Sequence, residues 1–391
     1  MTYDFSKLTQ RRGTDSYKWD SAPGDDIIPL WVADMDFETF PGITAALQRR
    51  VAHGIFGYTR VPDAYYESVT QWFAKRHGWQ IAKDDIIYTS GVVPAISAII
   101  KALTLPGDQV IVQGPVYNCF YSSIRNNGCE MVSNSLVYDR ATLRYEIDFD
   151  DLDAKLSHER ARLFLLCNPH NPGGRVWSRD ELARIGELCR RHGVRVVSDE
   201  IHCELTLHEN RYTPFGSLPD ELSRGSITCC SPSKAFNIAG LQIANIVCRD
   251  AEVRERIDRA ININEVCDVN PFGVCALQAA YTDEGHEWLT QLRAYITANY
   301  DLLRERFAAD MPHLPVMRME GTYLAWVDCS ALAETSEEIE ERLMREERVW
   351  VNAGGMYGKE GEHFIRINMA CPWERLEEGL RRIAKGLAPS K

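Results

Sequence analysis

The sequence has 391 residues, of which 45% are hydrophobic and 26% are charged. This composition is typical of a large globular enzyme, and the length allows more than one domain. Lys and Arg number 44 against 56 Asp and Glu, so the formal net charge is -12. The basic residues are also scattered along the chain and do not form the cluster that binding to a phosphate backbone requires, so we expect no nucleic-acid partner.

The cysteines and the apolar runs exclude further classes of protein. Twelve cysteines are dispersed without a C-x-x-C pair or other metal-binding spacing. This predicts a reducing, cytoplasmic location and no bound metal. The N-terminus has no apolar core of signal-peptide length, and no unbroken apolar stretch approaches the roughly 18 residues that a membrane helix needs. We therefore expect a soluble protein with no membrane partner.

The first forty residues are polar and aromatic, and they predict an irregular arm that lies over another surface. A helix is expected from Pro41, followed by a glycine-bounded loop over residues 54–59 that contains Tyr58. Another helix is expected over 64–75.

From residue 85 the chain predicts alternating strands and helices. Pro94 suits the first turn of a helix over 95–103, and Glu181 completes a capping box with Ser178 at the start of another. Such alternation indicates crossover units and a mostly parallel sheet, whose ligands lie at the carboxyl ends of the strands. The expected strands are 85–89, 109–113, one near 131, 162–167, 194–198, 227–230 and 242–248, with further helices from about 118 and over 149–156.

The last third of the chain has a different pattern, which predicts a smaller α+β domain. The expected domains are residues 1–45 (the arm and part of the small domain), 46–280 (large) and 281–391 (small). The expected elements are two helical blocks over 272–309 interrupted at Gly285, strands over 316–319, 322–328, near 349 and over 364–368, a helix opened by Thr335 with Glu338, and a last helix from 373.

Lys234 follows the apolar run 227–230, which predicts a buried strand, and it lies between hydroxyl and small residues in Ser231-Pro232-Ser233-Lys234-Ala235. Burial lowers a lysine pKa, and a neutral amine can attack an aldehyde to form an imine. Ser231 and Ser233 could both donate to one anionic group beside it. The alternative is a surface lysine whose alkyl stem packs against the strand end.

Two other strand ends carry polar side chains. Asp199 follows a run of buried β-branched residues, where a carboxylate needs a cationic or hydrogen-bonded partner. The structural alternative is a local cap or salt bridge. Asn168 and Asn171 lie in a stiff Pro/Gly turn, where turn chemistry alone could explain them. Together with Lys234 and a helix start suited to phosphate, these residues match the needs of pyridoxal phosphate: an imine lysine, a phosphate cup and an acid that keeps the ring nitrogen protonated.

The sequence also resembles the fold type I pyridoxal-phosphate enzymes of the aspartate aminotransferase group, and within it the cystathionine beta-lyases of MalY/PatB type. This resemblance implies an α/β fold with a large domain built on a mostly parallel seven-stranded sheet, a smaller α+β domain, and a homodimer. The segments that carry it span nearly the whole chain: 31–37, 56–58, 168–174, 199–202, 231–238 and 365–368.

The resemblance also implies roles for individual residues. The implied catalytic residues are Lys234, which forms an imine with the cofactor, Asp199, which pairs with the ring nitrogen, and Tyr58, which reaches the phosphate of the neighbouring subunit. Further cofactor contacts are implied for Tyr117, which stacks on the ring, Asn171, which bonds the ring oxygen, His202, and the phosphate ligands Val92 and Val93 (through their amides), Ser231 and Ser233. Substrate binding is implied for Arg366, which binds the α-carboxylate, and for Asn171.

Two residues depart from the aminotransferase pattern. His202 stands where those enzymes usually place a tyrosine, which resembles the lyase branch. Gln242 stands where an arginine usually contacts the phosphate, so the phosphate has one cation fewer.

The sequence is compatible with three functions. The leading hypothesis is β-elimination from cystathionine, cystine or another S-substituted cysteine, which yields a thiol, pyruvate and ammonia. An aminotransferase would use the same lysine. A non-catalytic regulatory or binding protein could also use this scaffold, since fold does not fix function.

Overall fold

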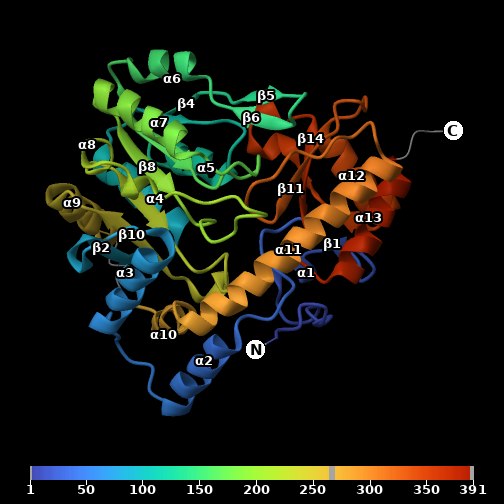
Figure 1. The fold of residues 1–391 in the computed structure, drawn as a ribbon, viewed down its shortest axis with the longest axis horizontal. Coiled ribbons are helices and arrows are strands. Elements are labelled where there is room, and N and C mark those ends of the chain that lie inside the picture. Colours follow the sequence, from blue (N-terminus) through green and yellow to red (C-terminus); the bar gives the residue numbers. More distant parts are fainter. Residues whose placement is uncertain (1, 264–268, 388–391) are drawn as a thin grey trace.

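The computed structural model describes residues 2–263 and 269–387, and its largest element is a seven-stranded sheet (Figure 1). The strand order is β2-β10-β9-β8-β7-β3-β4, and β10 runs antiparallel to both of its neighbours. The strands from β9 to β4 are parallel. The strands are β2 (Ile86–Thr89), β3 (Gln109–Val112), β4 (Glu130–Ser133), β7 (Ala161–Cys167), β8 (Arg195–Asp199), β9 (Ile227–Cys230) and β10 (Ala244–Cys248).

Helices cover both faces of this sheet, which is why its central strands are apolar throughout. Alternate residues such as Val110 and Ile111 pack into two separate apolar clusters, one against α4, α5 and α9 and the other against α6 and α7. The helices of this part are α3 (Asp63–His77), α4 (Val92–Leu103), α5 (Asn118–Asn126), α6 (Phe149–Leu156), α7 (Arg179–His192), α8 (Asp220–Ser223) and α9 (Ala251–Asn262).

A smaller antiparallel sheet, in the order β11-β14-β13, lies beside the large one. Figure 1 shows α11 running from the neighbourhood of α2 and α10 to this smaller sheet. The N-terminal arm joins the same part, because β1 pairs with β12. These elements are α1 (Tyr17–Asp20), β1 (Ile28–Pro29), α2 (Pro41–His53), α10 (Pro271–Ala280), α11 (Asp283–Asp310), β11 (Leu324–Asp328), α12 (Ser336–Glu346), β12 (Val349–Trp350), β13 (Asn352–Ala353), β14 (Phe364–Asn368) and α13 (Trp373–Leu387).

The sequence predicted most of these elements, and the fold class is confirmed. Both capping boxes are present, Ser178 with Glu181 and Thr335 with Glu338. Helix α9 and the hairpin of β5 (Val137–Asp139) with β6 (Arg144–Glu146) were not predicted.

Two predictions about the C-terminal part were wrong. The helical blocks separate at Tyr281 and Thr282, and Gly285 lies inside α11, where its amide donates to the capping hydroxyl of Thr282. The expected strand over 316–319 is reduced to one bridge between Val316 and Val327.

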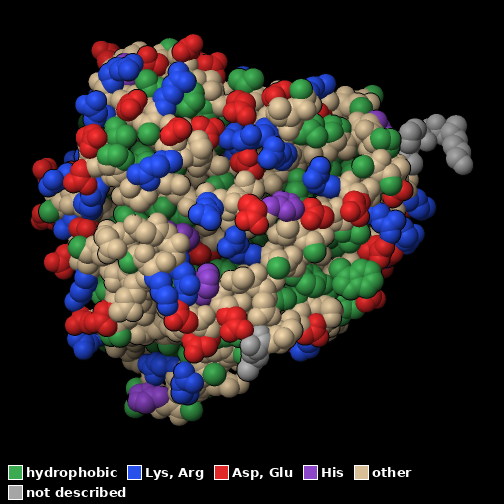
Figure 2. Space-filling model, in the orientation of Figure 1, with side chains coloured by type: hydrophobic (Ala, Val, Ile, Leu, Met, Phe, Trp, Pro, Cys, Tyr) green, Lys and Arg blue, Asp and Glu red, His purple; other side chains and the backbone are tan. Residues whose placement is uncertain are grey.

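Charges of both signs are mixed on the face in Figure 2, without a broad area of one sign. Within the described ranges no helix is long and apolar enough to cross a bilayer. No group of three or more His, Cys, Asp or Glu side chains there is placed to hold a metal ion.

Candidate active site

Lys234 lies just beyond the carboxyl end of β9, and its Nζ donates to the Ala33 carbonyl oxygen at 2.6 Å. The pKa of Lys234 is lowered to about 8, chiefly by burial and next by the Arg366 guanidinium, while Asp34 and Asp199 act in the opposite direction. At pH 7 about a tenth of such an amine is neutral, far more than of an ordinary lysine, and the neutral form is the nucleophile and base.

Asp199 ends β8, the strand beside β9, and it is 3% exposed. Its Oδ1 accepts a hydrogen bond from the Ile201 amide at 3.1 Å. Burial raises the pKa of Asp199 to about 7, against the influence of Lys234. A cationic group placed beside this carboxyl would restore its ionised form.

His202 lies in the turn that follows Asp199 and is also buried. Its pKa is well below its ordinary value because of burial, with Lys234 and Arg366 acting in the same direction. His202 is therefore neutral. Its Nδ1 has no hydrogen-bond partner among the described residues.

Arg366 reaches the site from β14, so the smaller sheet supplies one wall. Its Nη1 donates to Asn171 Oδ1 at 3.2 Å and its Nη2 donates to the Trp31 carbonyl at 2.9 Å. The guanidinium lies 4.8 Å from the ring centroid of Tyr357. In the described chain the buried Nε has no partner. A buried arginine with a donor to spare suits a carboxylate ligand.

The start of α4 supplies backbone amides near the same edge of the sheet. The helix begins at Val92 after Gly91, with no side-chain cap, so the first-turn amides lack the usual acceptor. Amides at a helix start attract anions such as phosphate. Val92 and Val93 stay predictions as phosphate ligands.

The two serines differ from one another in this structure. The Ser231 hydroxyl donates to the Ile243 carbonyl at 2.5 Å and accepts the Ser233 amide at 3.0 Å. Its proton therefore points into the protein, whereas the prediction directed it to a phosphate. Ser233 is about nine-tenths buried. Gln242 is exposed and offers no cation to replace the missing arginine.

The two tyrosines predicted to face the cofactor lie in different settings. Tyr117 precedes α5, and its pKa is raised by burial and then by Cys119, with Asp199 adding to the shift and Arg366 opposing it. These influences place it with the other site residues. Tyr58 is 97% exposed, so a single chain does not enclose it with Lys234.

Sequence reasoning missed two groups next to Lys234: the Ala33 carbonyl and the Tyr323 hydroxyl, which donates to that carbonyl at 2.9 Å. A backbone carbonyl leaves no signal in a sequence. Tyr323 lies in a predicted strand, where its aromatic ring suits the core as well as a site.

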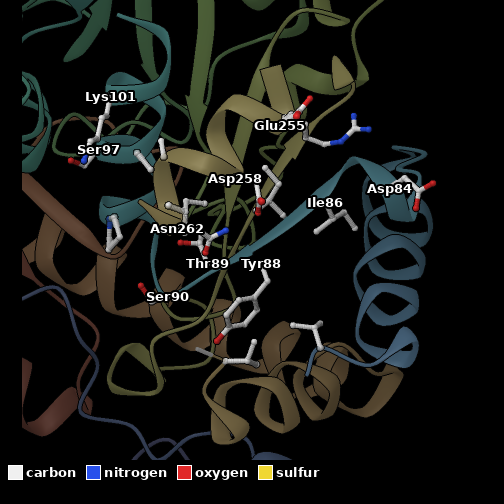
Figure 3. A pocket seen from close by; sticks show the side chains of 18 of the residues that line it. Asp84, Ile86, Tyr88, Thr89, Ser90, Ser97, Lys101, Glu255, Asp258 and Asn262 are labelled. Atoms are coloured by element: carbon white, nitrogen blue, oxygen red, sulfur yellow. The ribbon is translucent and has the colours of Figure 1, made fainter. Parts of the chain in front are cut away.

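A cavity of about 900 Å³ lies elsewhere, between β2, α4 and α9 (Figure 3). Tyr88 and Thr89 line it from β2, Lys101 from α4, and Asp258 and Asn262 from α9. Its lining within the described chain includes none of the residues predicted for catalysis. Charges of both signs line it, so it favours no single class of ligand.

Comparison with known proteins identifies relatives along nearly the whole chain. The model of the aminotransferase class I and II family matches residues 25–383. Cystathionine beta-lyase PatB of Bacillus subtilis (strain 168) is 42% identical over 390 residues, which are 98% of this chain and 100% of that protein.

Two solved structures have the same fold. Cystalysin from Treponema denticola, which contains a pyridoxal 5'-phosphate cofactor, has a TM-score of 0.95 and 33% identity, with 99% of both chains covered. The PLP-bound C-S lyase from Staphylococcus hominis has a TM-score of 0.91 and 31% identity, covering 99% of this chain and 98% of that one.

A lysine amine, a buried acid and an arginine gathered at the carboxyl edge of a mostly parallel sheet define an α/β enzyme scaffold built to bind a cofactor and a carboxylate. The chain belongs to the aminotransferase class I and II family. The predicted resemblance, including the MalY/PatB-type lyases, is confirmed.

Proposed function

We propose that the protein is a pyridoxal-phosphate-dependent C–S β-lyase. It cleaves cystathionine or a related S-substituted cysteine into a thiol, pyruvate and ammonia, with water as the second reactant. The observation that carries this proposal is the 42% identity to a cystathionine beta-lyase over 98% of the chain. The two cofactor-containing structures of high similarity support the cofactor.

The site's residues fit this cofactor. Lys234 offers an amine of lowered pKa. Asp199 offers a buried carboxyl whose ionised form a cation would stabilise. The start of α4 offers backbone amides that no side chain caps. The unpartnered nitrogen of His202 leaves room for a further bond. When bound, pyridoxal phosphate supplies an aldehyde for the amine and a ring that accepts electrons.

Each residue then has a defined task. Arg366 binds the substrate α-carboxylate through its guanidinium and so fixes the amino acid in one orientation. Lys234 in its neutral form removes the proton from the substrate α-carbon. The electron pair released at that carbon expels the thiolate from the β-carbon. The proton stays on Nζ, at hydrogen-bond distance from the Ala33 carbonyl.

Asp199 has an electrostatic task. With the cofactor bound, its carboxylate would keep the ring nitrogen protonated, since an adjacent anion favours the charged form. Tyr117 would pack on the cofactor ring, and Asn171 would bond its ring oxygen. The phosphate would be held by the Val92 and Val93 amides, by Ser233 and, less favourably directed, by Ser231.

We also propose a homodimer in the cytoplasm, with the chain divided into the domains 1–45, 46–280 and 281–391. Tyr58 contributes to the facing subunit's site. Its 97% exposure, together with the exposed neighbours Ile55 and Phe56, supports this proposal because such surface gains from burial in a symmetric contact.

The test is an assay of the purified protein with cystathionine. We expect pyruvate and homocysteine in equal amounts. Transfer of the amino group to an added 2-oxo acid without pyruvate release would make the protein an aminotransferase instead. A colourless protein that binds no pyridoxal phosphate would favour a regulatory or binding role.

A further inference from the structure

The Ala33 carbonyl oxygen is shared by two donors. Lys234 Nζ donates to it at 2.6 Å and the Tyr323 hydroxyl at 2.9 Å. A carbonyl oxygen has two lone pairs, so both are used. Because both donor atoms bond the same oxygen, the distance between them is at most the sum of the two hydrogen-bond lengths. The Tyr323 hydroxyl therefore lies close to the Lys234 amine.

Tyr323 is held firmly in this position. It is fully buried, and the preceding Thr322 has a φ of +68°, which is rare for a β-branched residue. The Thr322 amide donates to the Leu205 carbonyl at 2.7 Å, and the Gly321 amide donates to the Gly174 carbonyl at 3.0 Å. Such strain persists only where the surroundings impose it, and it is concentrated at functional sites.

The Ala33 peptide is fixed as well. The Asn368 side chain donates to the Val32 carbonyl at 2.5 Å and to the Asp34 carbonyl at 2.6 Å, one on each side of Ala33. The peptide cannot turn without breaking these bonds. The Ala33 carbonyl is therefore held facing Lys234 and Tyr323.

We propose that Tyr323 is a positioning residue for Lys234: its hydroxyl takes up part of the Ala33 carbonyl's hydrogen-bonding capacity and thereby favours the neutral amine. The reason is that an acceptor serving two donors binds each less strongly, and a weaker bond to the ammonium stabilises it less. The inference rests on the proposed function, in which the neutral amine is the base.

Other titratable or charged groups also face the amine and must be kept unchanged in a test. Arg366 comes from β14, Asp34 from the arm, Asp199 from β8 and Cys119 from α5. His202, in the turn after β8, is neutral. Removing the hydroxyl of Tyr323, the residue just before β11, alters none of these charges.

Tyr323 itself stays a neutral donor. Burial, followed by the carboxylate of Asp34, raises its pKa far above the working range. A change in the titration midpoint of Lys234 when this hydroxyl is removed therefore reflects the shared Ala33 carbonyl and not a titration of Tyr323 itself.

The experiment measures the titration of Lys234 directly in Tyr323→Phe. The full-length, cofactor-free protein is treated with acetic anhydride over a range of pH, and acetylation of Lys234 is followed by peptide mass spectrometry. We expect the midpoint to rise by about half to one pH unit, which is about three to ten times less neutral amine at pH 7. The acidic limb of the kcat profile of the holoenzyme should move the same way.

A second variant keeps the ring and the hydroxyl. Substituting 3-fluorotyrosine at position 323 makes the hydroxyl a stronger donor, so the midpoint should fall. The matched control is Tyr300→Phe, which removes another buried hydroxyl, bonded to the Met317 carbonyl at 2.9 Å. This control should leave the Lys234 midpoint unchanged.

An unchanged or lowered midpoint in a folded Tyr323→Phe protein would overturn the inference. If that variant does not fold, the fluorotyrosine protein decides: a midpoint that does not fall rejects the role of Tyr323. Absence of lyase activity in the wild-type protein would reject the proposed function but would leave the amine titration readable, so the two failures are distinguishable.

Discussion

At the scale of single residues, burial sets the protonation of the site. It lowers the pKa of Lys234 to about 8 and raises that of Asp199 to about 7, so both groups shift toward their neutral forms. Neither shift is caused mainly by a charged neighbour. A bound cofactor with a cationic ring and an anionic phosphate changes this balance, because it brings partners that the chain alone does not provide.

Replacing Lys234 by Ala removes both the covalent anchor and the base. We expect lyase activity to disappear and borohydride to fix no cofactor to the chain. Pyruvate release and the mass of the reduced protein measure the two effects. Lys101→Ala, at the rim of the separate cavity, is the control that should remain active. Lyase activity retained by Lys234→Ala would reject the assignment.

Replacing Asp199 by Asn keeps the size of the side chain but removes its charge. The cofactor should still bind, while kcat/KM falls by about 100-fold or more because the ring nitrogen is no longer held protonated. Steady-state kinetics and cofactor absorbance check this expectation. Asp220→Asn, an exposed carboxylate paired with Arg249, should behave as wild type. Near-normal kinetics in Asp199→Asn would make this acid a structural group.

At the scale of elements, the arm is locked to α13 by one buried carboxylate. Asp36 accepts hydrogen bonds from Arg11 at 2.7 Å, from Lys18 at 3.2 Å and from Trp19 at 2.9 Å. Arg375 of α13 contacts its other oxygen at 3.0 Å. Asp36 and Lys18 are both inaccessible to solvent, so this network fixes the segment that carries Ala33.

Replacing Asp36 by Asn should lower the free energy of unfolding by about 3–5 kcal/mol at pH 7, because buried Lys18 and its neighbour Arg375 lose their shared carboxylate and Lys18 keeps only the more distant Asp34, at 3.8 Å. Although burial acts to raise it, the pKa of Asp36 is lowered to about 2 by Lys18 and Arg375. Its stabilisation is therefore complete above the unfolded value of about 3.8 and is lost as the pH falls through 2.

Urea denaturation at several pH values measures this effect. The difference between wild type and Asp36→Asn should narrow below about pH 4, where the unfolded carboxyl takes up its proton. Thr282→Ala removes a helix cap whose hydroxyl bonds only the backbone groups of Ala279 and Gly285, and it should cost about 1 kcal/mol at every pH. A pH-independent difference for Asp36→Asn would contradict the electrostatic explanation.

At the scale of the whole molecule, the described chain presents an apolar loop between α2 and α3. Ile55, Phe56 and Tyr58 are more than half exposed, yet the loop is braced, since Arg50 donates to the Ile55 carbonyl at 2.8 Å and lies over the Phe56 ring. Phe56 also packs on Phe272 of α10. A braced apolar loop is a preformed surface for association.

The shared-site proposal predicts complementation between two impaired variants. In a heterodimer of Tyr58→Phe and Lys234→Ala subunits, one site carries both lesions and the other carries neither. Mixed subunits should therefore regain activity, up to about half the wild-type value per dimer. Activity and light scattering of purified heterodimers measure this. A fully active monomer, or no recovery in verified heterodimers, would exclude the shared site.

The sequence determined the family, the order of most elements and the position of Lys234, because these depend on short-range patterns. The apolar run 227–230 is strand β9 at those bounds, and Ser178 with Glu181 caps α7. Local bonding and alternating burial act over a few residues, so they can be read from the chain. The site roles inferred by resemblance remain predictions.

Only the tertiary structure decided what surrounds those residues. Gly285 looked like a helix break, but it allows close approach to the Ala280 carbonyl, which a Cβ would meet at 2.1 Å. Ser231 turns its proton to Ile243, and the Ala33 carbonyl holds Lys234 from 201 positions away. Bonds between distant backbone groups, and the burial that shifts a pKa, depend on how the whole chain packs and leave no local pattern in the sequence.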